Sequence, residues 1–506
     1  MVDGTVVDGT VADGTKPDVL VVGSGPVGAA YVRLLTRARP DLDVLVVEAG
    51  PVLSEPPGIN LRNVADPVQQ ERAQIQAQGQ ALSGADAVPL DIPGTVTARQ
   101  GTYLVEPGND QMPAAALASC VGGQGVLWTC AVPVPHDTER IPFIPRADWD
   151  EAVAVAGRLL SRTTEAFAGS AMSTAVIRTL GELFDPLLPA GRGVGVLPVA
   201  GQVQADGTVR WSGADTVLGD ARYRLRASTV CRRLILDGTT VAGAELAGMA
   251  SGDVTVVRPR VTVVAADAVH TPQLLWASGI RPAPLGRYLT EHPLTFAVVA
   301  VRDDLVPGYS VAGQQAADPV SSVICVPFAD PGHPFHAQAL HLDTCPPYFT
   351  GGQVAEPNAA GYLTMGWGCR KFPRASDGLT FSDTETDRWG MPKVSIQYAL
   401  TDREHAELGQ ALEHLTVAAK ELGRFVPGGE PKVMPAGSSL HYQGTYRLGD
   451  DGGAESVCDS HAQVWGLDNL FLGGNGTIPT ATACNPTLTS VAIAARSARR
   501  VLEVLR

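Results

Sequence analysis

Runs of apolar residues at two different spacings predict the first elements of the chain. Val19 to Val22 is a continuous apolar run that meets glycines, which is typical of a buried parallel strand entering a tight turn. A helical pattern follows to about Arg37, and a second apolar run, from Val44 to Val47, ends on Glu48. This order predicts a strand, helix, strand unit at the start of an α/β fold.

The rest of the chain predicts a second kind of architecture. From Val298 to Gln397 prolines and aromatic residues are frequent, which indicates a mainly β domain with irregular loops. Thr401 to Leu422 has the pattern of a helix. The other expected elements are strands at Arg226 to Val230, Val254 to Val257, Val261 to Ala265 and Leu470 to Leu472, and helices at Pro272 to Ser278 and up to Arg506.

Three glycines after the first strand form the pattern G-x-G-x-x-G. Gly23 permits the turn, Gly25 lets a pyrophosphate approach the backbone, and Gly28 lets helix and strand pack closely. Glu48 lies twenty residues beyond Gly28, where its carboxylate can accept hydrogen bonds from an adenosine ribose and would repel a 2′-phosphate. The pattern therefore predicts a bound FAD or NAD and argues against NADP.

Composition narrows the possible partners. The 506 residues carry a formal net charge of -14, which opposes binding to nucleic acid or to an anionic membrane. The eight cysteines form no CxxC or CxxxxC pair and no cluster at zinc spacing, so we expect no metal site and no disulfide reductase. No apolar run approaches the ~20 residues of a membrane helix, and the first residues do not resemble a secretory signal. We therefore expect a cytoplasmic protein without a membrane partner.

Five sequence blocks occur along the chain in a fixed order. They are VGGQGVLWTCAVP (Val121 to Pro133), LGRYLTEHP (Leu285 to Pro293), FSDTETDRWGMP (Phe381 to Pro392), SSLHYQGTYRLG (Ser438 to Gly449) and GGNGTIPTATACNPTLT (Gly473 to Thr489). Together they resemble the glucose-methanol-choline oxidoreductases, and within them the pyranose oxidases and bacterial glycoside 3-oxidases. The resemblance implies an enzyme that uses FAD to oxidise a ring hydroxyl, at carbon 2 or carbon 3, of a pyranose or glycoside, C-glycosides included. It implies O₂ or a quinone as electron acceptor.

The same resemblance implies that His441 is the active-site histidine and Asn485 its partner. A neutral imidazole can take the hydroxyl proton near pH 7 as hydride leaves the carbon, and Asn485 can donate to the developing alkoxide. Asn485 followed by Pro486 is also a favoured pair at the start of a helix. Helix capping therefore remains an alternative role for Asn485, in a terminal helix that we expect to begin there.

Further roles follow from the resemblance alone. Leu127 stands where fungal pyranose oxidases have a histidine that is covalently joined to FAD, so we expect FAD to be held without a covalent bond. Gln338 and His341 lie in a stretch that resembles the sugar-contacting segment of pyranose oxidases, and the loop from Thr344 to Glu356 is a candidate gate. His292 is expected to be structural. The implied cofactor contacts, besides the fingerprint, are Gly122, Gly123, Thr129, Val230, Gly474, Asn475, Pro486 and Thr487.

The expected fold class is α/β with α+β character: a discontinuous Rossmann-like FAD-binding domain and a second, mainly β, substrate-binding domain. Two other functions stay open, namely oxidation of a choline-like or aryl alcohol and non-catalytic flavin binding. Residues 1–16 repeat a VDGT-like unit and are expected to form a disordered tail. We assign residues 17–60, 100–135, 195–297 and 436–506 to the FAD-binding domain, and 61–99, 136–194 and 298–435 to the substrate-binding domain and connecting segments.

Overall fold

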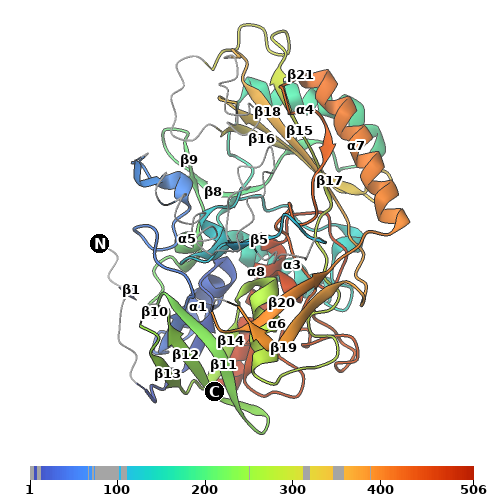
Figure 1. The fold of residues 1–506 in the computed structure, drawn as a ribbon. Helices are drawn as coiled ribbons and strands as arrows, with labels where there is room; N and C mark the ends of the chain where they lie inside the picture. Colours follow the sequence, from blue (N-terminus) through green and yellow to red (C-terminus); the bar gives the residue numbers. More distant parts are fainter. Residues whose placement is uncertain are drawn as a thin grey trace.

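Two large sheets organise the molecule, one parallel and one antiparallel, in the lower and upper halves of Figure 1. The expected mixed α/β class is confirmed. The structure is a computed structural model that describes residues 5–7, 13–66, 68–70, 73, 102–103, 111–249, 251–311, 320–345, 358–387 and 389–506. Most of the candidate gate from Thr344 to Glu356 lies outside the described residues.

The parallel sheet is built around the two apolar runs of the predicted opening unit. Its strands, in spatial order, are β1 (Thr5–Val7), β10 (Tyr223–Arg226), β3 (Val44–Val47), β2 (Val19–Val22), β14 (Val261–Val264) and β23 (Leu470–Leu472). All residues of β2 and β3 are buried, as expected for parallel strands covered on both faces. Helix α1 (Pro26–Ala38) joins β2 to β3, and it packs on α8 (Thr487–Val504), which also contacts α3 (Arg146–Leu159).

Two contacts of the N-terminal residues belong to this half: β1 pairs with β10, and Val256 N–H donates to the Asp13 carboxylate at 2.9 Å. Most of residues 1–16, the expected disordered tail, lie outside the described residues. One expectation about this half was wrong. The strand expected from Arg226 to Val230 is divided, because Ser228 adopts a left-handed conformation with φ 48°. This bend ends β10 at Arg226 and lets β11 start at Thr229 in a separate antiparallel sheet.

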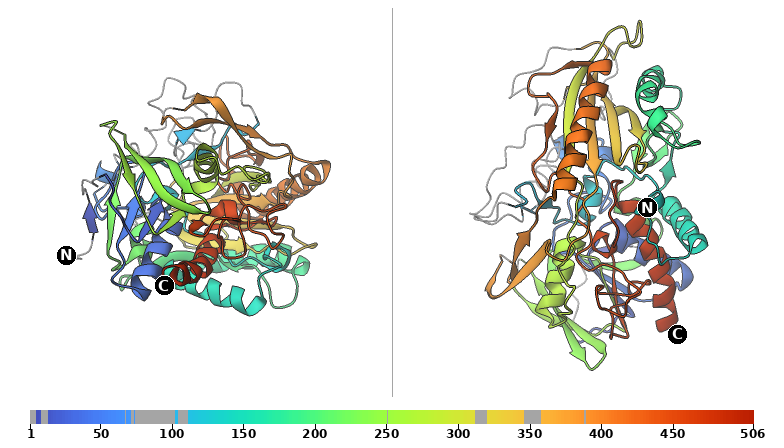
Figure 2. Two further views of the ribbon diagram at one scale, coloured as in Figure 1. Left: turned by 90° about the horizontal axis from the view of Figure 1, so that it is seen from below. Right: turned by 90° about the vertical axis from the view of Figure 1, so that its right-hand side faces the viewer.

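The antiparallel sheet carries helices on one face. Helices α4 (Ala171–Phe184) and α7 (Asp402–Leu422) share an apolar cluster with Ala337 and Ala339 of this sheet. The right-hand view of Figure 2 shows α7, in orange, running along the sheet in the upper half of the molecule, whereas α8, in red, lies in the lower half. The strands are β21 (Gly423–Phe425), β15 (Leu294–Val301), β18 (Tyr362–Cys369), β17 (Phe335–Leu342), β16 (Val320–Val326) and β7 (Gly195–Val196), with β22 (Lys432–Val433) beside β15.

Smaller units complete the fold. They are β11 (Thr229–Asp237), β12 (Thr240–Gly248) and β13 (Val254–Val257); β6 (Arg162–Thr163), β8 (Val199–Val203) and β9 (Val209–Trp211); the pairs β4 (Thr102–Tyr103) with β5 (Ala116–Leu117) and β19 (Gly378–Thr386) with β20 (Pro392–Gln397); and helices α5 (Ala214–Leu218) and α6 (Asp267–Ala277). The range 195–297, assigned to the FAD-binding domain, also supplies β7 and the start of β15 to the antiparallel sheet. Among the described residues, no helix is long and apolar enough to cross a membrane.

Candidate active site and cofactor cavity

A cavity opens where strands β2, β3 and β14 of the parallel sheet end. Gly23, Glu48 and Ala265, which directly follow these three strands, line it. The carboxyl ends of parallel strands are the usual ligand site of such sheets. The predicted residues that line the cavity are Gly23, Gly25, Glu48, Gly123, Thr129, Val230, His441, Gly474, Asn475, Asn485 and Thr487. Gly28, Gly122, Pro486, Gln338 and His341 lie outside the set of described lining residues.

The three fingerprint glycines have the geometry that a dinucleotide site needs. Gly23 has φ 101°, and a Cβ atom there would lie 2.3 Å from the Ala265 carbonyl oxygen. A Cβ atom on Gly28 would lie 2.1 Å from the Gly23 carbonyl oxygen, so this glycine allows α1 to pack closely on its strand. At Gly25 the nearest atom is the Gly122 carbonyl oxygen, 3.9 Å away, which leaves space open toward the cavity.

Helix α1 begins beside this open space. Its N-cap residue is Gly25, and among the described residues no side chain caps it. The first amide groups of the helix and its dipole therefore favour an anionic group at this point. The residues present fit a pyrophosphate.

Glu48 is held in place at the end of β3. Its carboxylate accepts hydrogen bonds from the Ser24 hydroxyl at 2.7 Å, from Ser24 N–H at 3.1 Å and from Gly50 N–H at 3.0 Å. Burial raises the pKa of Glu48, and the hydrogen bonds from Gly50 and Ser24 oppose that shift. The Ser24 oxygen also accepts from Gly122 N–H at 3.0 Å. Gly122 thus fixes the turn behind the cavity, where a Cβ atom would lie 2.7 Å from Gly58 Cα.

The same cavity is lined by His441 and Asn485, which lie close together. The His441 Nε2 atom lies 3.4 Å from Asn485 Nδ2. Burial lowers the pKa of His441 to about 4, so its imidazole is neutral near pH 7. The Gln338 amide donates to Asn485 Oδ1 at 2.5 Å, which places β17 of the antiparallel sheet directly behind Asn485.

Comparison with known proteins identifies the family. Models described as GMC oxidoreductase match residues 191–294 and 373–494. The chain is 40% identical over 503 residues to a C-glycoside 3-oxidase of Microbacterium trichothecenolyticum, covering 96% of each chain. The chain belongs to the GMC oxidoreductase family. A pyranose 2-oxidase of Tricholoma matsutake is 29% identical, with 96% of this chain and 94% of the relative covered.

Solved structures support the same GMC fold. A pyridoxine 4-oxidase from Mesorbium loti superposes with a TM-score of 0.66 at 20% identity, covering 96% of this chain and 99% of that one. GMC oxidoreductases are FAD-binding flavoproteins, so FAD is the dinucleotide for which this cavity is built. The chain is an oxidoreductase that acts on a CH–OH group.

The alternative role of Asn485 as a helix cap was wrong, and so was the expectation that the terminal helix begins there. Helix α8 begins at Thr487, and Pro486 is its N-cap residue. Among the described residues, no side chain caps this helix. The Asn485 amide instead bonds Gln338 and faces His441. The helix still points its N-terminus at the cavity, which Thr487 lines.

The side chains of Gln338 and His341 lie on opposite faces of β17. Side chains alternate along a strand, so residues three apart face opposite sides of the sheet. Gln338 faces Asn485, whereas His341 is fully buried on the other face. Its Nδ1 atom bonds the Ser321 hydroxyl, and its Nε2 atom lies 2.7 Å from the Ala360 carbonyl oxygen.

Sequence reasoning missed two residues that support the site. His292 was expected to be structural, yet its ring contacts that of His441, with Nδ1 atoms 3.0 Å apart. The buried Glu139 carboxylate accepts from the N–H groups of Ala483 and Cys484, directly before Asn485. His292 could have been noticed because it lies in one of the quoted blocks, LGRYLTEHP. The sequence around Glu139 gives no such signal.

Proposed function

We propose that this enzyme uses FAD to oxidise a secondary ring hydroxyl of a glycoside, C-glycosides included, to a ketone at carbon 3. The observation that carries the proposal is the pairing of a neutral His441 with Asn485 in the lining of a dinucleotide cavity. The family supplies the reaction class. The names of the relatives supply the substrate class, because the protein at 40% identity is a C-glycoside 3-oxidase and the one at 29% is a pyranose 2-oxidase.

His441 takes the proton in this proposal. A hydroxyl releases hydride from its carbon readily only as its proton leaves, and a neutral imidazole within hydrogen-bond reach can accept that proton at Nε2. Bound FAD would supply the hydride acceptor. Asn485 Nδ2, held from behind by Gln338, donates to the substrate oxygen as negative charge develops there.

Other residues of the cavity would hold the cofactor. Gly25 and the start of α1 would hold the pyrophosphate, and Glu48 would accept from the adenosine ribose. Gly123, Thr129, Val230, Gly474, Asn475 and Thr487 would contact the remainder of the cofactor. We infer that FAD is bound without a covalent link, since Leu127 lines the cavity and offers no nucleophile. We further propose O₂ or a quinone as the electron acceptor.

Anaerobic titration separates the candidate substrates. Purified holoenzyme is mixed with glucose, an aryl C-glycoside, an aryl O-glycoside, choline or benzyl alcohol, and loss of the flavin absorbance is followed. We expect the glycosides to bleach the flavin fastest and NMR of the product to place the ketone at carbon 3. A ketone at carbon 2 of glucose would correct the substrate and the position. Bleaching by choline or benzyl alcohol alone would refute a sugar substrate, and no bleaching at all would indicate a flavin-binding protein without turnover.

A further inference from the structure

Backbone pairing brings a second histidine against His441. Thr290 and Gln443 exchange backbone hydrogen bonds of 3.0 and 2.9 Å in an antiparallel bridge. Residues two positions along each segment therefore lie opposite one another, and these are His292 and His441. The backbone N–H of His292 and the backbone N–H of His441 each donate to the Ser439 hydroxyl oxygen at 3.3 Å. That hydroxyl in turn donates to the buried Glu291 carboxylate at 3.1 Å.

A single proton lies between the Nδ1 atoms of the two rings. The His292 and His441 Nδ1 atoms are 3.0 Å apart, and two ring nitrogens at that distance bond only when one carries a proton and the other does not. Burial lowers the pKa of both rings, and for His292 the proximity of His441 adds to the effect. Each ring is therefore neutral near pH 7 and has one N–H group.

The chemistry proposed for His441 requires one of the two arrangements. A neutral His441 can accept a proton at Nε2 only if its own proton is on Nδ1, and His292 Nδ1 must then be the acceptor. The His292 proton is in that case on Nε2, which lies 3.2 Å from the Thr482 hydroxyl oxygen. Thr482 in turn donates to Gln443 Oε1 at 3.0 Å, so every proton in this chain has an acceptor.

Gln443 favours the opposite arrangement. Its amide nitrogen lies 3.0 Å from His292 Nε2 and 3.3 Å from the His441 carbonyl oxygen, so it donates to both. A His292 ring that accepts at Nε2 carries its proton on Nδ1 and gives it to His441 Nδ1. His441 then has its proton on Nε2, where it cannot take another. The surroundings of His292 thus bear directly on whether His441 is a base.

We propose that His292 is a positioning residue that sets the tautomer of His441, by accepting the N–H of His441 Nδ1 and leaving Nε2 free. When the substrate hydroxyl gives its proton to His441 Nε2, His441 becomes an imidazolium whose Nδ1–H remains bonded to His292, and no proton leaves the pair. This inference rests on the proposed role of His441 as the base. The hydroxyl of Thr482 supports this arrangement, whereas the amide nitrogen of Gln443, 3.0 Å from His292 Nε2, opposes it.

Two variants distinguish positioning from packing. In His292→Asn the side-chain oxygen can occupy the place of Nδ1 and accept from His441, whereas His292→Leu has similar bulk and no acceptor. We expect stopped-flow flavin reduction to be about ten- to hundredfold slower in His292→Leu, the range found when the hydrogen-bond partner that orients a metal-binding histidine is removed. We expect His292→Asn to stay within about threefold of wild type. His405→Leu, an exposed change on α7, is the control and should not alter the rate.

Nitrogen NMR gives a readout that does not depend on turnover. In oxidised holoenzyme without substrate and with ¹⁵N-labelled histidine, the His441 signals, assigned with His441→Ala, should report a proton on Nδ1 in wild type and His292→Asn. In His292→Leu they should shift toward the Nε2–H form. A wild-type His441 protonated only at Nε2 would overturn the inference, even if His292→Leu failed to fold. So would equal rate losses in both His292 variants with unchanged His441 signals.

His441→Ala separates this inference from the proposed function. If His441→Ala reduces its flavin at the wild-type rate, His441 is not the base and the proposed mechanism fails. If His441→Ala is slow while His292→Leu is as fast as wild type, only the role of His292 fails.

Discussion

At the scale of single residues, Asn485 has both ends of its side-chain amide engaged. Gln338 donates to its oxygen, so its nitrogen must face His441, 3.4 Å away. The Asn-Pro pair in the sequence suggests a helix cap, but Pro486 is in the cap position. Because the Asn485 nitrogen carries two N–H groups and does not cap the helix, one of them can donate to the substrate oxygen. Replacing Asn485 should therefore affect chemistry more than folding.

Asn485→Asp tests that distinction. The carboxylate can still accept from Gln338, but it loses the donor toward the cavity and places a negative charge beside His441. Because loss of one such donor costs about 3 kcal/mol, we expect flavin reduction to slow roughly a hundredfold or more, with a nearly unchanged melting temperature. Stopped-flow reduction and thermal unfolding of the holoenzyme measure the two effects. A stable variant that reacts at the wild-type rate would remove Asn485 from the mechanism.

Leu127 leads to a prediction about the cofactor itself. An alkyl side chain cannot form the bond that a histidine forms in fungal pyranose oxidases, so acid precipitation should release all of the FAD into the supernatant. Absorbance of the supernatant and the pellet checks this directly. Colour retained in the pellet would mean that another nucleophilic residue lining the cavity, such as His270 or Cys231, carries the flavin.

The residue scale also shows where sequence reasoning stops. The fingerprint glycines and Glu48 could be placed because their roles depend on local turns and on the end of one strand. Gln338 and His341 could not be separated, because the face that each occupies depends on how β17 pairs within its sheet. Glu139 was missed altogether, since its partners beside Asn485, Ala483 and Cys484, are more than 340 residues away.

At the scale of elements, Glu139 ties a short helical turn (Asp137–Glu139) to the segment before Asn485. Its carboxylate accepts from Ala483 N–H at 2.8 Å and Cys484 N–H at 3.0 Å through one oxygen, and from His136 N–H at 2.8 Å through the other. The side chain is buried, and burial raises its pKa. Asn485 is thus positioned by a turn that lies far from it in sequence.

Glu139→Ala should loosen this segment. It leaves buried N–H groups without their acceptor, each costing about 1–3 kcal/mol, so we expect a lower melting temperature together with slower flavin reduction. Glu139→Gln keeps one acceptor oxygen and should lie between Ala and wild type. The exposed change Glu165→Ala is the matched control. A Glu139→Ala enzyme that melts earlier but reacts as fast as wild type would limit Glu139 to stability.

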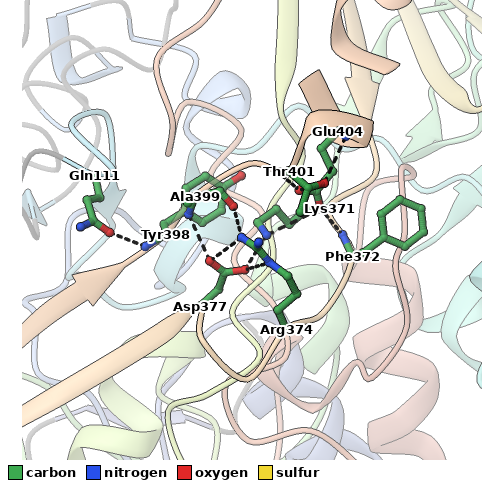
Figure 3. Close-up of polar contacts among 9 residues, drawn as sticks. All are labelled: Gln111, Lys371, Phe372, Arg374, Asp377, Tyr398, Ala399, Thr401 and Glu404. Atoms are coloured by element: carbon green, nitrogen blue, oxygen red, sulfur yellow. Dashed lines mark hydrogen bonds and ion pairs between the residues drawn. The ribbon is translucent and has the colours of Figure 1, made fainter. Parts of the chain in front are cut away.

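A buried ion network fixes the start of α7. Figure 3 shows Lys371 between Asp377 and Glu404, with Nζ to carboxylate distances of 2.6 and 3.6 Å. Glu404 also forms a capping box with Thr401, the residue before α7. Arg374 completes the network by bonding Asp377 at 2.8 Å. All four charges therefore lie where the helix meets the β19 and β20 hairpin region.

Lys371→Met should be strongly destabilising. Removing one partner from a buried ion pair leaves an uncompensated charge and typically costs about 3–5 kcal/mol. Arg403→Ala, which breaks an exposed pair with Glu407 on the same helix, should cost no more than about 0.5 kcal/mol. Chemical denaturation of both variants compares them. Equal stability of the two variants would show that the network does not hold α7.

Elements with strong local signals were predictable, and those defined by partners were not. Helix α7 follows the expected Thr401 to Leu422 pattern because its capping box and apolar spacing are local. The short strand β1 forms by pairing with β10. It could not be predicted from the VDGT-like repeat in which it lies. The division between β10 and β11 depends on one left-handed residue, Ser228, whose N–H donates to the Gly50 carbonyl oxygen.

At the scale of the whole molecule, the active site is assembled from both sheets. His441 and Asn485 come from the C-terminal segment that returns to the parallel sheet, and Gln338 comes from the antiparallel sheet. The site therefore forms only when the two halves are packed together. Groups buried by that packing also make the stability of the folded protein depend on pH.

Buried histidines and Glu291 make opposite contributions to that dependence. Burial lowers the pKa of His333 to about 3, whereas an unfolded histidine has a pKa of about 6.5. Below pH 6.5 the unfolded chain binds a proton at His333 that the folded chain does not bind. The free energy of unfolding therefore decreases as pH falls from 6.5 toward 3, by up to about 1.4 kcal/mol per pH unit. Burial raises the pKa of Glu291 to about 7, so its contribution falls as pH rises from about 4.5 to 7.

Two substitutions should therefore change the pH dependence of melting in opposite directions. His333→Phe removes a group that makes the protein less stable in acid, so the drop in melting temperature from pH 7 to pH 5 should become smaller than in wild type. Glu291→Gln removes a group that favours the folded state in acid over the same interval, so the drop should become larger. Differential scanning calorimetry of each holoenzyme at pH 5, 6 and 7 supplies the comparison, and the difference between pH values removes any constant effect of the substitution on packing. Parallel curves for all three proteins would mean that neither buried group changes its protonation on unfolding.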